Sequence, residues 1–334
     1  MPTITDRLVD SFGRVHTNLR ISVTDRCNIR CAYCMPESVR FLPRGDLLTF
    51  EEIERLVRVA AGLGVDKIRL TGGEPLVRRD LSRLVEKLAA VPGIRDVGLT
   101  TNGILLAPIA HALRAAGLRR INVSLDTLDP GRFRALTRRD GLDRVIEGIF
   151  AAKAAGFDPV KLNALAIKGS TEPDVVPLGQ FAREHGLEMR FIEYMPLDAG
   201  NHWDRDHVLL ADEILDRLSR GIGPLAPSLD QDPRAPALDY DYVDGGGRVG
   251  LIASVSRPFC GSCNRLRLTA DGKLRNCLFA LDELDLRHLL RDEPNDDAPI
   301  ARALAASVAG KWEGHEINTA RFIKPERLMH AIGG

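Results

Sequence analysis

The sequence has no excess of charge of either sign and no long apolar run. Its 46 Lys and Arg residues balance its 46 Asp and Glu residues, so no overall field favours a nucleic acid or a membrane surface as a partner. No stretch approaches the length of a membrane span, and residues 1–6 lack the basic-then-apolar order of a signal peptide. We therefore expect a cytoplasmic protein that binds neither nucleic acid nor membranes.

Cysteine is also scarce, and disulfide bonds are not expected because they are rare in cytosolic proteins. The chain has only six cysteines, which fall in two tight groups within residues 27–34 and 260–277. Cysteines grouped in this way indicate metal binding rather than a covalent crosslink. The 44% hydrophobic content is that of an ordinary globular protein and excludes general disorder.

Six short β-rich segments alternate with amphipathic segments over the first 200 residues or so. This alternation predicts βα units around a parallel sheet. Six units are fewer than the eight of a full barrel, and periodicity alone does not separate an incomplete barrel from a doubly wound open sheet. The predicted strands are Leu19–Thr24, Lys67–Thr71, Asp96–Thr101, Arg120–Ser124, Val160–Ile167 and Glu188–Tyr194.

The segments between the strands carry helix signals that indicate packing only. Thr49 and Glu52 have the spacing of a capping box at the start of a helix. Leu81–Leu88 and Arg144–Ala155 have the apolar spacing of helices that pack on one face. We assign no function to these segments.

The alternation stops after Pro196. Residues 221–247 are rich in Pro, Asp and Gly, which predicts a long surface connection. We therefore divide the chain into residues 1–220 and a C-terminal region, 221–334. In that region, the apolar spacing predicts helices at about Glu283–Leu290 and Ile300–Val308.

The first cysteine group, Cys27, Cys31 and Cys34, directly follows the first predicted strand with the spacing C-x3-C-x2-C. Three thiolates so close together can hold three corners of a cubane iron–sulfur cluster and leave one iron open. A structural zinc site normally has four protein ligands. From spacing alone, a zinc site completed by a distant histidine such as His16 stays open.

The second group, Cys260, Cys263 and Cys277, again supplies three thiolates without an adjacent fourth ligand. A zinc site completed by His288 or His315 is the alternative that the spacing leaves open.

Two arginines lie between the cysteines of the second group. Arg265 and Arg267 alternate along a predicted strand, so both point to the same face, beside the metal. A pair of fixed guanidinium groups suits a polyphosphate.

Two motifs resemble the radical S-adenosylmethionine superfamily, in the form found in its GTP 3′,8-cyclase family. Residues 25–36, DRCNIRCAYCMP, are similar to the cluster-binding signature, and residues 71–75, TGGEP, are similar to the turn that receives the methionine amino group of S-adenosylmethionine. Six cysteines in two triads also fit these cyclases. The resemblance implies an α/β fold, an incomplete (β/α)6 TIM-like barrel, whose C-terminal region carries a second iron–sulfur cluster.

The resemblance also implies roles for individual residues. Two [4Fe–4S] clusters are implied, one on Cys27, Cys31 and Cys34, which binds S-adenosylmethionine, and one on Cys260, Cys263 and Cys277, which meets the guanine ring. The implied S-adenosylmethionine site comprises Tyr33, Gly73, Ser124 and Met195. The implied GTP site comprises Arg20, Arg69, Thr100, Lys161, Arg190, Arg265, Leu266 and Arg267, of which Arg20, Arg265 and Arg267 are also implied to be catalytic.

Four of the implied GTP ligands, Arg20, Arg69, Lys161 and Arg190, come from four different predicted strands and would converge on the lumen of the barrel. Because buried cations need an anion, we expect a triphosphate to supply it. The Gly333-Gly334 tail is implied to reach into the same site, where the lack of side chains permits close approach.

The implied activity is that of a lyase. The enzyme would cleave S-adenosylmethionine to a 5′-deoxyadenosyl radical, remove hydrogen from C3′ of GTP and join C3′ to C8, giving 3′,8-cyclo-7,8-dihydro-GTP in the first step of molybdenum cofactor biosynthesis. The implied partners are an external one-electron donor, a second copy in a homodimer, and cyclic pyranopterin monophosphate synthase as the next enzyme. The alternatives are a radical enzyme acting on a peptide and a zinc-stabilised module without catalysis.

Overall fold

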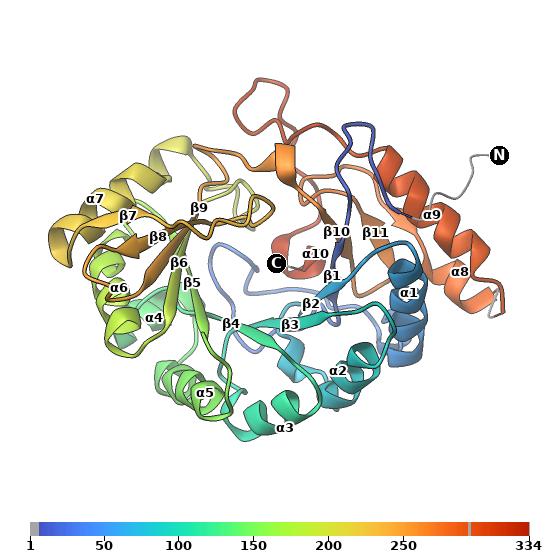
Figure 1. The fold of residues 1–334 in the computed structure, drawn as a ribbon, viewed down its shortest axis with the longest axis horizontal. Helices are drawn as coiled ribbons and strands as arrows, with labels where there is room; N and C mark the ends of the chain where they lie inside the picture. The colour runs from blue at the N-terminus through green and yellow to red at the C-terminus, as the bar shows by residue number, and fades with distance from the viewer. Residues whose placement is uncertain (1–6, 293–294, 334) are drawn as a thin grey trace.

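A single sheet of twelve strands curves into an incomplete barrel in the computed structural model, which describes residues 7–292 and 295–333 (Figure 1). The strand order is β12-β11-β10-β1-β2-β3-β4-β5-β6-β9-β8-β7. The six central strands are parallel and follow one another in chain order. They are β1 (Asn18–Ser22), β2 (Lys67–Thr71), β3 (Asp96–Thr101), β4 (Arg120–Ser124), β5 (Lys161–Ala166) and β6 (Glu188–Glu193).

These six strands confirm the six that the sequence predicts, and their unbroken order confirms the incomplete barrel over the doubly wound sheet. Two further strands extend the parallel part, since β9 (Arg248–Ile252) pairs with β6 and β10 (Arg265–Leu268) pairs with β1. Antiparallel strands complete the edges, namely β7 (Leu225–Pro227), β8 (Leu238–Tyr242), β11 (Lys273–Arg275) and β12 (Leu284–Asp285).

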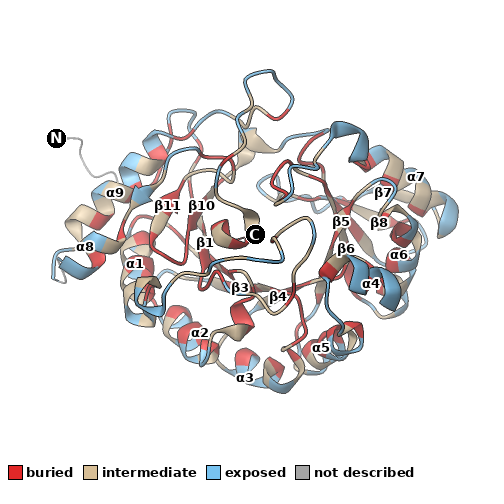
Figure 2. Ribbon diagram, turned by 180° about the vertical axis from the view of Figure 1, so that it is seen from behind, coloured by how far each residue is buried: buried red, intermediate tan, exposed pale blue. Residues whose placement is uncertain are grey.

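Most helices lie on the outside of the sheet, with buried residues toward the strands and exposed residues toward solvent (Figure 2). The short α10 (Met329–Ile332) lies instead at the centre of the ring of strands (Figure 1). The other helices are α1 (Phe50–Gly62), α2 (Leu81–Ala89), α3 (Ala110–Ala115), α4 (Pro130–Thr137), α5 (Leu142–Ala154), α6 (Val175–Glu184), α7 (Ala211–Gly221), α8 (Arg287–Asp292) and α9 (Ala298–Ala309).

The predicted capping box is present at the start of α1. Thr49 Oγ1 accepts a hydrogen bond from Glu52 N at 3.1 Å, and Thr49 N donates to Glu52 Oε2 at 2.7 Å. The helices expected at 81–88, 144–155 and 300–308 are confirmed as α2, α5 and α9.

The expectation of a long surface connection over residues 221–247 is wrong in part. Strands β7 and β8 form within it and pair antiparallel with each other, and β8 pairs with β9. Tyr242 is buried at the end of β8, so this segment contributes to the core. Three glycines, residues 245–247, lie in the turn between β8 and β9, and Gly245 and Gly247 have positive φ.

The helix expected over residues 283–290 begins later than predicted. Leu284 and Asp285 form β12, which pairs with β11, and α8 begins only at Arg287. The Asp285 carboxylate accepts a hydrogen bond from Arg287 N at 2.9 Å, as expected of a residue that initiates a helix.

The sheet continues across residue 220, because β6 lies before that point and its partner β9 lies after it. The division of the chain at residue 220 remains a prediction. Within residues 7–292 and 295–333, no helix combines the length and the apolar character needed to cross a membrane.

Candidate active site

The first cysteine triad lies on the loop after β1, at the carboxyl end of the strand. Backbone hydrogen bonds fix this loop to α4, from Arg30 N to Thr137 O and from Ala32 N to Leu136 O, each 2.9 Å long. The turn after β2 closes on the loop from the other side, with Gly73 N 2.7 Å from Thr24 O.

The two glycines of this turn permit that close approach. A Cβ atom added to Gly72 would lie 2.7 Å from Thr24 O, and one added to Gly73 would lie 2.4 Å from Arg26 O. Since real Cβ atoms do not come so close to backbone oxygen, any side chain here would push the turn away from the cysteine loop.

Glu74 ties the same turn to the end of β3. Its buried carboxylate accepts hydrogen bonds from Leu76 N at 2.9 Å, and from Thr101 Oγ1 and Asn102 N at 2.7 Å each. Burial raises the pKa of Glu74 to about 7. Asn102 in turn places its amide nitrogen 3.8 Å from Cys27 Sγ, so the carboxylate indirectly orients a neutral donor toward the triad.

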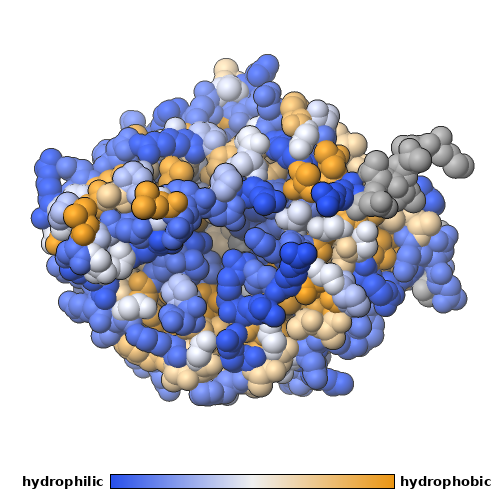
Figure 3. Space-filling view, in the orientation of Figure 1, coloured by the Kyte–Doolittle hydropathy of each residue, from blue (hydrophilic) through white to orange (hydrophobic). Residues whose placement is uncertain are grey.

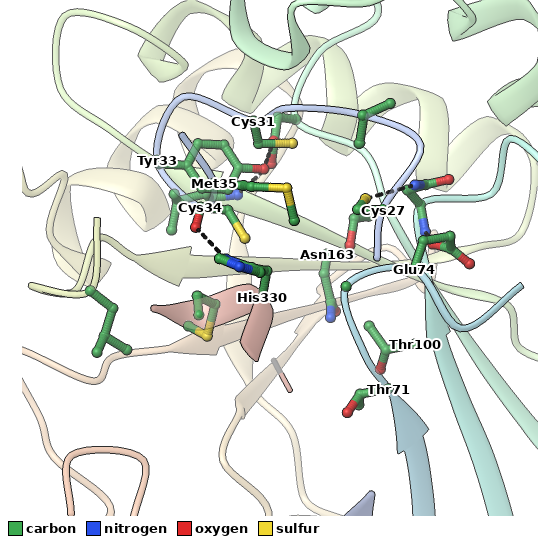
Figure 4. A pocket seen from close by; sticks show the side chains of 18 of the residues that line it. Cys27, Cys31, Tyr33, Cys34, Met35, Thr71, Glu74, Thr100, Asn163 and His330 are labelled. Atoms are coloured by element: carbon green, nitrogen blue, oxygen red, sulfur yellow. Dashed lines mark hydrogen bonds between the residues drawn. The ribbon is translucent and has the colours of Figure 1, made fainter. Parts of the chain in front are cut away.

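A pocket brings the first triad together with the predicted S-adenosylmethionine residues (Figure 4). It is lined by Cys27, Cys31 and Cys34 and by Tyr33, Gly73, Ser124 and Met195. Thr100, predicted for GTP, also lines this pocket. All of these residues come from the carboxyl ends of strands or from the loops that follow them, where barrel enzymes place their active sites.

The three thiols of this triad are partly buried and interact electrostatically with one another. Burial raises the pKa of Cys27 to about 11 and that of Cys34 to about 12, so both are protonated in the metal-free protein at neutral pH. Three adjacent thiols fit an iron–sulfur cluster, which deprotonates its ligands on binding.

The second triad lies at the opposite end of the barrel. Cys260 and Cys263 precede β10, which is parallel to β1, and Cys277 follows β11, which is antiparallel to β10. All three are therefore at the amino-terminal edge of the sheet. Burial alone would raise the pKa of Cys263, but the positive charges of Arg265 and Lys311 lower it to about 6, so this sulfur is prepared to bind a metal as a thiolate.

The histidines considered as zinc ligands have other surroundings. His16 Nε2 lies 3.0 Å from Asp10 Oδ2, and His16 is not among the residues of the first pocket. His288 is exposed on α8. The His315 ring packs against Phe279, and His315 forms a hydrogen bond to Cys260 through its backbone. No group of three His, Cys, Asp or Glu side chains in the described part of the chain lies close enough to hold a single metal ion.

Three arginines lie in one row across adjacent strands, because the register places Arg20 between Arg267 on β10 and Arg69 on β2. Burial and the positive charge of Arg267 lower the pKa of Arg20 well below its ordinary value. Over residues 7–292 and 295–333, neither Arg20 nor Arg267 has a carboxylate partner, although Arg267 Nη1 donates to Gly333 O. Such a row of buried cations is stabilised by an anion.

The other predicted cations are already paired, which corrects the expectation that a triphosphate alone would neutralise all four. The Glu188 carboxylate contacts Lys161 Nζ at 2.5 Å and Arg190 Nε at 2.7 Å. Arg69 Nη1 donates to Asn122 Oδ1 at 2.9 Å, which is a neutral partner.

Two predicted GTP residues on β10 differ in orientation. The Leu266 side chain is fully buried in the main core, because alternation along the strand turns it away from the arginine row. Arg265 lies with its guanidinium 4.5 Å from the centre of the Phe259 ring and acts electrostatically on Arg20 and Cys263.

The sequence analysis missed several residues of the site. Glu188 stands two positions before Arg190 on β6, so strand alternation already placed both on one face. No sequence pattern points to Asn102, Asp126 or Lys311, because each contacts residues of the site that are distant from it in sequence. Asp126 accepts a short hydrogen bond from the Tyr33 hydroxyl, and Lys311 contacts Cys263.

Comparisons with known proteins agree with this geometry. The Radical SAM superfamily model matches residues 21–182, and the Molybdenum Cofactor Synthesis C model matches residues 187–317. A GTP 3′,8-cyclase of Rhodopirellula baltica is 53% identical over 98% of this chain and 92% of its own length. A GTP 3′,8-cyclase of Streptomyces coelicolor is 48% identical over 98% of this chain and 96% of its own length.

The chain belongs to the GTP 3′,8-cyclase family of radical S-adenosylmethionine enzymes. Among solved structures, Streptococcus suis SuiB bound to S-adenosylmethionine shares the fold with a TM-score of 0.61 at 18% identity, over 88% of this chain and 69% of SuiB. The structure of anSMEcpe with bound S-adenosylmethionine has the same TM-score of 0.61 at 14% identity, over 90% of this chain and 79% of its own. Family membership implies a [4Fe–4S] cluster and S-adenosylmethionine as cofactors.

Proposed function

We propose that this chain catalyses the reaction for which its family is named. The 5′-deoxyadenosyl radical takes the hydrogen atom from C3′ of GTP, and the C3′ radical adds to C8 of the guanine. One electron, from the external donor, and one proton then convert the resulting radical to 3′,8-cyclo-7,8-dihydro-GTP, in the first step of molybdenum cofactor biosynthesis. The observation that carries the proposal is the arginine row, in which Arg20 and Arg267 have no carboxylate partner among the described residues. The row provides a place for a triphosphate inside a barrel with a cysteine triad at each end.

In this proposal the first triad holds the cluster that binds S-adenosylmethionine. When bound, this cluster supplies the electron that cleaves the cofactor to methionine and a 5′-deoxyadenosyl radical. Tyr33, Gly73, Ser124 and Met195 hold the cofactor in the pocket, with Gly73 offering backbone that a ligand can approach closely.

The GTP triphosphate binds the row formed by Arg20, Arg267 and Arg69, with Arg265 beside it. On the far side of the barrel, the Glu188 carboxylate holds Lys161 and Arg190 in place. Because Glu188 partly neutralises these two cations, they attract the triphosphate less strongly than the arginine row does. The second triad holds a [4Fe–4S] cluster against which the guanine is oriented.

Residues of the C-terminal tail exclude water from this space. Met329 and His330 line the first pocket, and Gly333 lies against Ser22 and Thr71, where an added Cβ would be 2.7 Å from Thr71 Oγ1. A closed, dry site protects a radical from side reactions. Gly334, the last residue of the predicted tail, lies outside the described residues.

The cellular context belongs to the same proposal. The enzyme works in the cytoplasm as a homodimer, takes single electrons from an external donor, and passes its product to cyclic pyranopterin monophosphate synthase. A peptide substrate is less well supported, since neighbouring arginines that lack carboxylate partners among the described residues, Arg20 and Arg267, suit a polyphosphate better than a peptide.

The experiment is a turnover assay with anaerobically reconstituted protein, S-adenosylmethionine and a chemical reductant. We expect 5′-deoxyadenosine to be released rapidly with GTP and only slowly with ATP or without a nucleotide. Equal release with every nucleotide, or none with GTP, would overturn the proposal.

A further inference from the structure

Lys311 is a buried cation that the proposed reaction does not use. It follows α9 directly after Gly310, and its backbone nitrogen donates to Val308 O at 3.0 Å. Its side chain runs inward, and the residue is only 5% exposed. The ammonium donates to Arg265 O at 2.9 Å and lies 3.5 Å from Cys263 Sγ.

This ammonium has no carboxylate partner among the residues that the structure describes. A buried ammonium without a counter-ion is costly. The groups that favour its positive charge are the sulfurs of Cys263 and Cys277, while Arg265 adds a further positive charge. The favourable placement of Lys311 therefore depends on the charge of the second triad.

The segment that carries Lys311 is fixed to the second triad by an independent contact. Arg14 Nη1 donates to Cys260 O at 2.8 Å and to Glu313 O at 2.6 Å, and Arg14 Nη2 donates to Trp312 O at 2.6 Å. Gly314 packs directly on the same loop, where an added Cβ would lie 3.3 Å from Cys260 Cβ. Lys311 is thus held in position rather than free to move away.

The first triad offers a contrast. Cys27 Sγ lies 3.8 Å from the neutral amide nitrogen of Asn102, and the charges that act on Cys27 oppose each other, since Glu74 is negative and Arg30 is positive. Hydrogen bonds to cluster sulfurs and nearby positive charge both stabilise the reduced, more negative form of an iron–sulfur cluster. The two triads therefore differ in a feature that sets reduction potential.

We propose that Lys311 is a positioning residue of the second triad, which supplies a fixed positive charge and a hydrogen bond to the Cys263 thiolate and so makes the bound cluster easier to reduce. The inference rests on the second cluster of the proposed function. It adds a residue that tunes this cluster without touching the substrate.

The test uses the full-length chain with Cys27, Cys31 and Cys34 replaced by alanine, so that all bound iron belongs to the second triad. Iron and sulfide are measured after anaerobic reconstitution, and the reduced fraction is followed by electron paramagnetic resonance at controlled potentials. In this background, Lys311→Met should lower the ratio of reduced to oxidised cluster about tenfold at a fixed potential, equivalent to about 59 mV for one electron. Lys311→Arg should remain within about twofold of the parent.

The control is Lys87→Met, which removes a lysine from α2 that pairs with Glu54 at 2.7 Å, far from either triad in the fold. It should leave the ratio unchanged. If Lys311→Met does not retain iron, Lys311→Gln, which keeps a donor but not the charge, should still show a lowered ratio. An unchanged ratio at full iron content would overturn the role of Lys311. A parent without iron would overturn the second cluster itself, and this proposal with it.

Discussion

The cations inside the barrel differ in their partners, and this difference separates their roles. Lys161 and Arg190 share one carboxylate, whereas Arg20 and Arg267 have none among the described residues. A ligand with several negative charges gains most where the protein supplies no competing anion. The free energy of triphosphate binding should therefore come mainly from the β10, β1 and β2 side of the barrel.

A second buried group, outside the site, makes stability depend on pH. The His16 side chain is fully buried, with Nε2 3.0 Å from Asp10 Oδ2. Burial, together with the positive charge of Lys311, lowers the pKa of His16 from 6.5 to about 4 despite the contact with Asp10. His16 therefore binds a proton more weakly in the folded protein than in the unfolded chain.

We predict that the iron-free protein loses stability as the pH falls below about 6.5. The unfolded chain takes up the His16 proton first, so the free energy of unfolding should fall by about 2 kcal/mol between pH 7 and pH 5 from this group alone. Urea unfolding at the two pH values measures the change. In His16→Gln the drop should shrink by that amount, and an equal drop in both proteins would contradict the assignment.

At the scale of elements, a glycine on β3 makes room for an arginine of the row. Gly98 is opposite Arg69 in the parallel register, and an added Cβ would lie 3.2 Å from Arg69 Cζ. The Arg69 guanidinium therefore crosses β3 over Gly98 and reaches Asn122 on β4.

We predict that Gly98→Ala displaces the Arg69 guanidinium and weakens GTP binding about five- to tenfold, the loss expected for one charge-assisted hydrogen bond. Equilibrium binding of GTP to the anaerobic protein provides the measurement. Gly62→Ala on α1 is the matched control, since no heavy atom lies within 4 Å of the added Cβ, and it should bind GTP like the parent. Equal affinities for both variants would contradict the role of Arg69.

The elements that sequence analysis predicts well are those fixed by local pattern. The six central strands and the capping box at Thr49 depend on neighbouring residues, and all appear in the structure. Strand β8 was missed because Pro, Gly and Asp are as common in short edge hairpins as in loops, and only its pairing with β9 distinguishes the two. The late start of α8 at Arg287 likewise depends on the pairing of Leu284 with β11.

The same distinction applies to the site. Spacing indicates each cysteine triad, and the resemblance to the family implies the role of the Gly-Gly-Glu-Pro turn, because each motif lies within a short stretch of sequence. The pairing of Glu188 with Lys161, and the contact between Lys311 and Cys263, join residues that are 27 and 48 positions apart. Such contacts are set by the closure of the sheet and not by any local pattern.

At the scale of the whole molecule, the barrel has a cysteine triad at each end and arginines between them. Figure 3 shows the centre of one face hollowed and surrounded mainly by hydrophilic residues. The parallel pairing of β1 with β10 creates this arrangement, since Cys27 follows the first strand and Cys263 precedes the second. A nucleotide bound to the arginine row would lie between the two triads.

The tail completes the enclosure. Helix α10 lies at the centre of the ring of strands, and Gly333 O accepts a hydrogen bond from Arg267 (Figure 1). Arg267 thus belongs to the proposed nucleotide site and also contacts Gly333.

The most direct test of the account is the fate of the hydrogen on C3′ of GTP. Anaerobic protein is incubated with S-adenosylmethionine, a reductant and GTP carrying deuterium at C3′, and the 5′-deoxyadenosine is analysed by mass spectrometry. We predict that it carries one deuterium and that 3′,8-cyclo-7,8-dihydro-GTP forms in equal amount. If the GTP is completely labelled at C3′ and the cyclised product forms together with unlabelled 5′-deoxyadenosine, hydrogen removal from C3′ by the 5′-deoxyadenosyl radical is contradicted.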